Sequence, residues 1–163
     1  TADALPYLNE DFIVNLFEST GVLTPTELAS RYEVYSEQYI LSIEVEAKLV
    51  VEMATTMIYP AAITYLSDLA VTNAGMTDMG IEMDSSIAKK VAGEANAMMA
   101  SVAELSAALE AHDFASTDEH MSYLAGTVRG LMDSIRANAD TLEGLVADDL
   151  WPLAKYREML FVK

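Results

Sequence analysis

Two histidines are the side chains in this sequence with the clearest potential for metal chemistry. His112 and His120 flank the acidic segment 113–119, and imidazole and carboxylate groups are common zinc ligands. A helical zinc site needs a second ligand three or four residues away, as in His-x-x-x-His or Glu-x-x-His. Neither histidine has such a partner. We therefore expect two solvated loop residues and no metal site here.

The acidic pair Glu44 and Glu46 is a second candidate for metal binding. Residues two positions apart share one face of a β-strand, whereas on an α-helix they point about 200° apart. The apolar residues around this pair recur at helical spacing. We therefore interpret the two glutamates as part of a solvated helix face and assign them no metal.

The remaining reactive side chains form no recognisable catalytic pattern. No serine or threonine has a histidine and an acid at a spacing typical of a triad, and the seven glycines are isolated, so no phosphate-binding loop is expected. Arg129 and Arg136 lie seven residues apart and should pair with acids of neighbouring helices. The sequence therefore indicates no catalytic, cofactor-binding or metal-binding residue.

The composition favours a helical protein with few types of partner. Of 163 residues, 52% are hydrophobic, while glycine (7) and proline (4) are scarce. The net charge of −17 disfavours nucleic acid and anionic membrane surfaces. No stretch of 18 uninterrupted apolar residues occurs, so we expect no membrane-spanning helix. The absence of cysteine fits the cytoplasm, which is the location we expect.

Helix signals begin close to the start of the sequence. Residues 9–20 form a short amphipathic pattern that Gly21 should stop. Thr24 and Glu27 form a capping box around a favoured first-turn proline. Apolar or aromatic residues then recur every three or four positions from 28 to 69.

This pattern predicts one very long helix that ends near residues 73–75. Pro60 interrupts the helix without changing its phase, which predicts a kink.

Two further helices follow. One starts at Asp84 or Ser85 and closes near residues 112–113, and the other starts at a second capping box, Ser116 to Glu119. Asn138 interrupts the apolar seam of the latter, where an asparagine more often fixes register than binds a ligand. The expected core residues are Ile87, Val91, Ala95, Met98, Val102, Leu105 and Leu109 in the former helix, and Met121, Leu124, Val128, Leu131, Ile135, Leu142 and Leu145 in the latter.

Short connections make consecutive helices antiparallel neighbours. We therefore predict an all-α fold, an antiparallel up-down-up three-helix bundle with one very long, Pro-kinked first helix, a short N-terminal helix and a docked C-terminal tail. The expected segments are an N-terminal linker with the short helix (1–22), the bundle (23–147) and the docked tail (148–163).

The C-terminal tail should pack on protein, because bulky apolar side chains rarely end a free chain. The first helix presents a second surface, since its length of about 75 Å exceeds the roughly 45 Å of the other two helices. Its part before residue 47 then needs cover from outside the bundle, unless the helix breaks at Pro60 and the short helix covers everything. The candidate packing and interface residues are Tyr32, Tyr35, Tyr39, Trp151, Leu153, Tyr156, Leu160 and Phe161.

Several strings resemble a known family. The tail 148–161 (DDLWPLAKYREMLF), the segment 23–35 that begins LTPTEL, the run 43–47 (IEVEA) and the run 58–65 that begins IYPAA resemble the type III glutamine synthetases. The middle, 74–140, matches only in being helical. Ala154 departs from the family, which usually has a second proline there.

The resemblance implies a non-catalytic C-terminal domain of an enzyme that joins ammonia to glutamate with ATP and a divalent metal such as Mg²⁺. The partners would be the missing catalytic domain of the same chain and other subunits of a homo-oligomer. The family holds metal with Glu-x-Glu on a strand, so Glu44 and Glu46 do not inherit that role. Thr1 would then be a cut point within a longer chain. The alternative is a free-standing acidic helical-bundle module that binds a protein or ligand.

Overall fold

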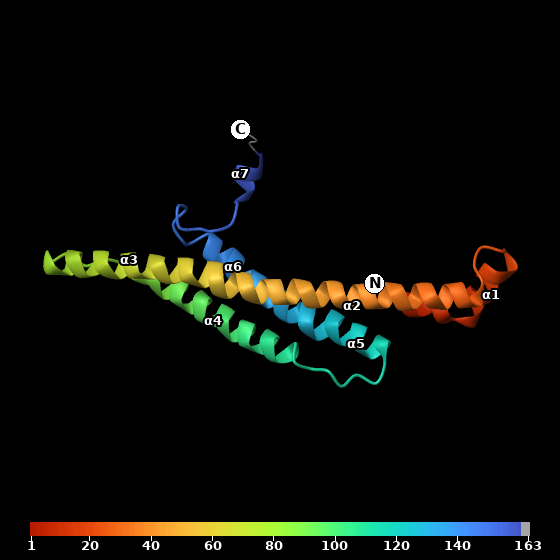
Figure 1. Ribbon diagram of the computed structural model, residues 1–163. Coiled ribbons are helices and arrows are strands. Elements are labelled where there is room, and N and C mark those ends of the chain that lie inside the picture. The colour runs from red at the N-terminus through yellow and green to blue at the C-terminus, as the bar shows by residue number, and fades with distance from the viewer. Residues whose placement is uncertain (161–163) are drawn as a thin grey trace. The chain divides into compact units, whose positions relative to one another are not determined.

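The computed structural model describes residues 1–160, without the side chains of Tyr156 and Arg157. Within this range the chain forms helices, turns and loops, and no strand (Figure 1). The all-helical fold class is therefore confirmed. In chain order the elements are η1 (Leu5–Asn9), α1 (Asp11–Ser19), α2 (Pro25–Met53), η2 (Ala54–Ile58), α3 (Tyr59–Asp78), α4 (Ser86–Ala108), α5 (Thr117–Tyr123), η3 (Leu124–Val128), α6 (Arg129–Glu143) and α7 (Tyr156–Leu160).

The chain divides into two compact units, each built from two separate stretches of sequence. Unit 1 contains Thr1–Lys48 and Ser106–Gly130, and unit 2 contains Leu49–Leu105 and Leu131–Lys163.

The capping box at the start of α2 forms as predicted. Glu27 Oε2 accepts hydrogen bonds from the Thr24 backbone N–H and from its hydroxyl, both at 2.8 Å. The Glu27 N–H donates in return to the Thr24 hydroxyl oxygen at 3.3 Å. These local bonds satisfy donors that a helix start otherwise leaves unpaired, which is why the helix begins at Pro25.

The same hydrogen bonds predict a pH dependence. The backbone and hydroxyl donors of Thr24 lower the pKa of the Glu27 carboxyl below its ordinary value of 4.5. A lowered pKa in the folded state gives a contribution that is complete above 4.5 and is lost as the pH falls through the folded-state pKa. We expect urea unfolding followed by circular dichroism to show a smaller loss of stability between pH 6 and pH 3 in Glu27→Gln than in the wild type.

Glu33, an exposed residue of the same helix, provides the matched control. Glu33→Gln should keep the wild-type acid dependence, and a Glu27→Gln variant with unchanged acid dependence would contradict this role of the capping box.

Two glycines with left-handed backbone end helices in the same way. After α1, Gly21 (φ 69°) donates its N–H to Glu18 O, and Val22 donates to Phe17 O. After α3, Gly80 (φ 76°) donates to Thr77 O, and Ile81 donates to Met76 O. Both patterns are Schellman motifs, in which glycine adopts the positive φ without a steric penalty. The stop at Gly21 is confirmed.

The predicted helix end near residues 73–75 is wrong. Gly75 stays inside α3, which continues to Asp78. A glycine inside a helix costs only about 1 kcal/mol, so it does not by itself end the helix. The helix ends where the motif at Gly80 satisfies its last carbonyls.

The irregularity that we predicted as a kink at Pro60 takes the form of a π-helical turn. The turn η2 lies just before the proline, and the Tyr59 N–H donates to Ala54 O five residues earlier. Proline has no N–H, and its ring clashes with the carbonyl four residues before it in a regular α-helix. In a π turn the backbone N–H bonds to the carbonyl five residues earlier instead of four. The helix therefore passes from α2 through η2 into α3 without interruption.

The core of unit 2 follows the predicted seam for most of its length. The buried side chains of α4 are Val91, Ala95, Met98, Val102 and Leu105, and those of α6 are Ile135 and Leu142. Asn138 Nδ2 donates to Glu94 Oε2 at 2.9 Å, which pairs the seam asparagine with a neighbouring helix. The prediction for Ile87 is wrong, because it lies exposed in the first turn of α4, where the seam has not yet begun.

The core of unit 1 lies against the part of α2 that we expected to lack cover. Leu28 and Ile43 of α2 are buried, as are Met121 of α5 and Leu124 and Val128 of η3. The Tyr32 hydroxyl donates a hydrogen bond to Asp118 Oδ1 of α5. The prediction that the bundle covers the first helix only from Ala47 onward is therefore wrong. The helix lengths alone could not show that the chain after α4 places α5 beside α2.

The continuous helix Pro25–Asp78 contains an 18-residue window with a mean hydropathy of 1.4, of which 22% is buried. By length and composition this helix could cross a membrane, and core helices of soluble proteins meet the same criterion. The low buried share means that much of this apolar surface lies uncovered within the described residues.

Candidate functional site

The predicted tyrosine stripe of α2 does not form one exposed surface. Tyr32 and Tyr39 are half-buried in unit 1, whereas Tyr35 is exposed. Burial raises the pKa of the Tyr32 phenol, and its hydrogen bond to Asp118 raises it further. The structure thus places two of the three tyrosines toward the interior of unit 1 and leaves Tyr35 as the accessible member.

A different set of α2 residues forms an exposed apolar stripe. Val34, Leu41 and Val45 are 55%, 62% and 55% exposed. We call these three residues the outer stripe. On the same helix Ser36, Ile43 and Ala47 are buried and form an inner stripe with the same steps of seven and four residues. The two stripes are offset by two residues, or about 200°, so they occupy opposite faces of the helix.

Sequence reasoning missed the outer stripe because it followed a single apolar path along the helix. The signal was present, since residues 34, 41 and 45 repeat the spacing of residues 36, 43 and 47. A helix that is apolar on two opposite faces is typical of an element with partners on both sides.

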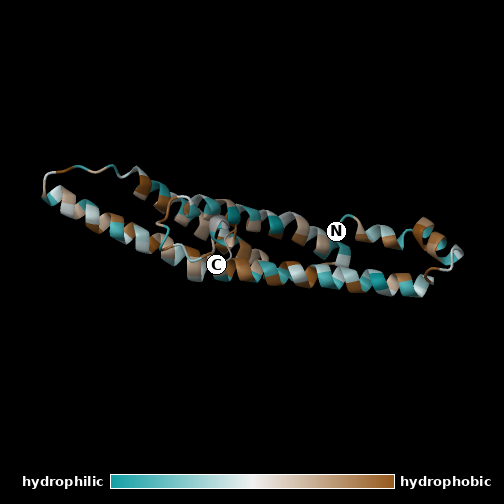
Figure 2. Ribbon diagram, turned by 90° about the horizontal axis from the view of Figure 1, so that it is seen from above, coloured by the Kyte–Doolittle hydropathy of each residue, from teal (hydrophilic) through white to brown (hydrophobic). Residues whose placement is uncertain are grey.

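The short helix α1 adds a second exposed apolar surface to unit 1. Phe12 and Leu16 are exposed, while Ile13 and Phe17 are half-buried, so the apolar side of the predicted amphipathic segment 9–20 is only partly covered. Hydrophobic residues gather on this helix in Figure 2. A shallow hollow of about 420 Å³ lies here, lined by Phe12, Asn15, Leu16, Glu18 and Ser19.

His120 is not the solvated loop residue that we predicted. It lies in α5 of unit 1, and its ring stacks on Phe114 with a centroid separation of 4.3 Å and an interplanar angle of 9°. His120 Nε2 lies 3.5 Å from Glu44 Oε1. Glu46 lies on a solvated face as predicted, whereas Glu44 is half-buried. Spacing could not show this contact, because 76 residues separate the two side chains.

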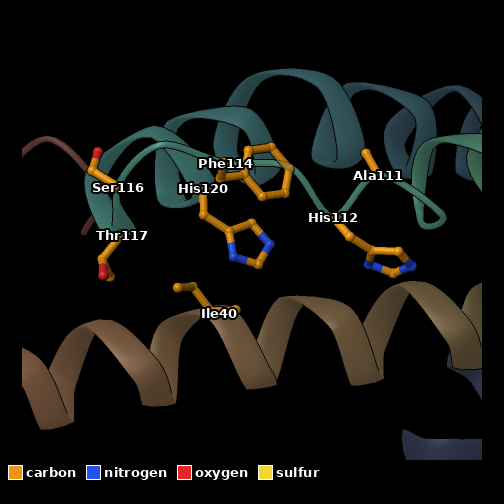
Figure 3. A pocket seen from close by; sticks show the side chains of 7 residues that line it. All are labelled: Ile40, Ala111, His112, Phe114, Ser116, Thr117 and His120. Carbon is orange, nitrogen blue, oxygen red and sulfur yellow. The ribbon is translucent and has the colours of Figure 1, made fainter.

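A hollow of about 260 Å³ surrounds this stack (Figure 3). Ile40 lies on the α2 side and His112 lies in the loop after α4, and the imidazole rings of His112 and His120 both line the hollow. Within residues 1–160 no group of three or more His, Cys, Asp or Glu side chains could hold a metal ion.

The C-terminal tail meets unit 2 through Trp151. The indole is 9% exposed, and Leu153 is half-buried. Both residues line a groove of about 470 Å³, which we call the tail groove. Its other walls are the end of α2 with η2, and α6; they contribute Val50, Met53, Ala54, Ile58, Met132, Asp133, Ile135, Arg136, Ala139, Asp140 and Glu143, and Ala154 completes the lining. Lys155 Nζ pairs with Asp148 Oδ1 at 2.7 Å and closes the turn of the tail.

Of the remaining predicted interface residues of the tail, only Leu160 has a side chain among the described residues. Leu160 is 61% exposed in α7, so it does not pack on its own unit. The Tyr156 side chain and Phe161 lie outside the described residues. The tail thus combines a packed tryptophan with an exposed apolar end.

The predicted role of the two arginines is wrong for Arg136. Its guanidinium Nε contacts both carboxylate oxygens of Asp140 at 3.3 Å, which is an i,i+4 pair within α6 rather than a link to a neighbouring helix. Both side chains are largely exposed, so this pair adds little to stability.

Comparison with known proteins identifies relatives of this chain. The glutamine synthetase C-terminal domain family matches residues 1–77. The type-3 glutamine synthetase of Dictyostelium discoideum is 28% identical over 100% of this chain, which corresponds to 23% of that protein. Glutamine synthetases of Bacteroides fragilis and Butyrivibrio fibrisolvens are 30% and 29% identical over 87% and 98% of the chain, or 21% and 23% of their own lengths.

The chain therefore spans less than a quarter of the relatives that it matches. The match across nearly the whole chain includes the tail and the region of α4 to α6, where sequence strings alone showed only shared helicity. Residues 1–77 thus match the glutamine synthetase C-terminal domain family, and the chain along its whole length is similar to part of a type-3 glutamine synthetase.

Proposed function

We propose that this chain is a non-catalytic C-terminal domain with a structural role, packing against the catalytic part of a type III glutamine synthetase and between its subunits. The parent enzyme would ligate ammonia to glutamate with hydrolysis of ATP and use a divalent metal such as Mg²⁺. We assign that chemistry to the parent, because the relatives carry more than three quarters of their length outside the region that this chain matches.

The outer stripe is the observation that carries this proposal. Its three apolar side chains are more than half exposed and lie on the face of α2 opposite the buried inner stripe. Single exposed apolar residues are common on proteins, whereas a regular stripe along a helix is typical of a contact surface. The relatives carry more than three quarters of their length outside the matched region, so a large partner is available in the same polypeptide.

A protein partner also accounts for the uncovered apolar part of helix Pro25–Asp78 better than a lipid partner does. The net charge of −17 is repelled by anionic membrane surfaces. We accordingly propose a cytoplasmic location.

We also propose that the long helical segments run up, down and up. The pairing of Asn138 with Glu94, which joins α6 to α4, supports this arrangement.

The test is a pair of substitutions in the full-length parent enzyme. Val34→Asp with Leu41→Asp should dissociate the oligomer and lower ligase activity at least tenfold, because burial of two unpaired carboxylates opposes assembly. Sedimentation velocity measures the assembly state, and glutamine formation measures the activity.

Ser42→Asp is the matched control, since Ser42 is exposed about 100° from Leu41 on the same helix. The control should leave assembly and activity unchanged. The 163-residue chain that carries Val34→Asp and Leu41→Asp should keep its helical circular dichroism and melting temperature, because both positions are exposed. Wild-type assembly and activity in the double variant would overturn the proposal.

A further inference from the structure

The C-terminal arm, residues 155–163, has a charge opposite to that of the rest of the chain. It holds three of the nine basic residues, Lys155, Arg157 and Lys163, of which Lys155 pairs with Asp148 of its own copy, and one acid, Glu158. The preceding 154 residues hold the other six basic residues and 25 of the 26 acidic ones. The arm is thus the most basic part of a strongly acidic protein.

The described end of this arm is also apolar and uncovered. Met159 and Leu160 of α7 are each 61% exposed, although Trp151 a few residues earlier is buried. Two neighbouring exposed apolar side chains on a basic segment favour a partner surface that is apolar and acidic.

The tail groove of unit 2 has that chemistry. Val50, Ile58 and Ile135 contribute apolar side chains to its lining. Acidic residues Asp133 and Glu143 also line it, and the single basic residue, Arg136, is paired with Asp140. The groove therefore complements the arm in both polarity and charge.

The position of the groove relates it directly to the arm. Leu153 and Ala154 line the groove, and α7 begins two residues later at Tyr156. The arm thus leaves unit 2 from the edge of the groove, and the exposure of Met159 and Leu160 shows that they do not fill the groove of their own copy. Two copies related by a two-fold axis near this edge could exchange arms reciprocally, because each contributes one arm and one groove.

We propose that the tail groove binds the C-terminal arm of a second copy of this chain, so that two copies exchange arms. This inference rests on the proposed packing role and specifies one contact between subunits. A nine-residue arm buries less than the roughly 1,600 Å² of a standard stable interface, so the isolated chain should dimerise weakly and in a concentration-dependent way.

Site-specific disulfide formation tests this exchange, because the chain contains no cysteine. One copy carries Leu160→Cys and the other carries Ala139→Cys, a half-buried position in the groove. Under mild oxidation of the mixture at high protein concentration, we expect a disulfide-linked product with twice the 17.7 kDa chain mass. The yield should fall severalfold in 1 M salt, where the Debye length shrinks to about 3 Å.

The control pairs Leu160→Cys with Val71→Cys, an exposed position of unit 2 outside the groove, and should give no more product than random collision. A chain that carries both Leu160→Cys and Ala139→Cys distinguishes an arm that binds in the groove of its own copy from an arm that binds in the groove of another copy. Predominantly intramolecular disulfide at low concentration in that chain, or no linked product above the control in the mixture, would overturn the exchange. Neither outcome affects the outer stripe, which is tested separately through the assembly of the parent enzyme.

Discussion

Replacing Trp151 with alanine is expected to lower the free energy of unfolding of this chain by about 3–5 kcal/mol. The indole is 9% exposed and lines the tail groove together with Ile58 and Ile135. Its removal deletes a large apolar contact and leaves a cavity that the surrounding helices cannot fully close. Urea unfolding must be followed by circular dichroism, because Trp151 is the only tryptophan and its fluorescence disappears with the substitution.

Met159→Ala is the matched control for the tail, since Met159 lies in the same segment and is exposed. Its stability should change by less than about 0.5 kcal/mol. A loss below about 1 kcal/mol in Trp151→Ala would mean that the tail contributes little to the fold of this chain and that its packing requires the rest of the enzyme.

Leu124→Ala is expected to lower the free energy of unfolding by about 2–5 kcal/mol. Leu124 begins the π turn η3 and is almost fully buried in unit 1. The truncation removes apolar contacts from the core that also contains Leu28 and Met121. Denaturant unfolding followed by circular dichroism measures the change.

Leu41→Ala provides the comparison, because it is the same chemical substitution at an exposed position of unit 1. We expect a change below about 0.5 kcal/mol for the isolated chain, in contrast to the large effect that Leu41→Asp should have on assembly of the parent. Equal losses in Leu124→Ala and Leu41→Ala would contradict the assignment of inner and outer faces in unit 1.

Helix boundaries were predictable where they depend on neighbouring residues. The capping boxes at Thr24 and Ser116 both form, and Glu119 N–H donates to Ser116 Oγ at 3.1 Å. The carboxylate of Glu119 departs from the standard box by accepting from the Ala115 N–H at 2.7 Å. Such bonds join residues within four positions of each other, so the local sequence contains all the information that they need.

The end of the long helix shows where local reasoning fails. Gly75 and Gly80 are both plausible stops in the sequence, and only Gly80 adopts the left-handed conformation. The choice between them depends on whether the extra turn of helix makes enough contacts to offset the conformational entropy lost in ordering it. Those contacts are set by tertiary structure.

The candidate site was predicted less well than the fold. The tail was identified from its composition, and Trp151 is buried on unit 2. The tyrosine stripe was assigned to an outward surface, but Tyr32 faces Asp118 of α5. The contact between His120 and Glu44 could not be predicted, because residues this far apart in sequence meet only through tertiary packing.

The sequence by itself determined the helical class, the starts of α2 and α5, the stop at Gly21, the family and the core seams of α4 and α6. These features follow from short-range hydrogen bonds, from 3.6-residue periodicity and from specific strings of residues. The predicted apolar path along α2 includes Ile43 and Ala47, which are buried, and tertiary structure alone decided that a second stripe of the same spacing stays exposed. Residues 36, 43 and 47 and residues 34, 41 and 45 repeat the same spacing, so periodicity cannot distinguish them. The helices that pack against α2 bury the first set and leave Val34, Leu41 and Val45 exposed.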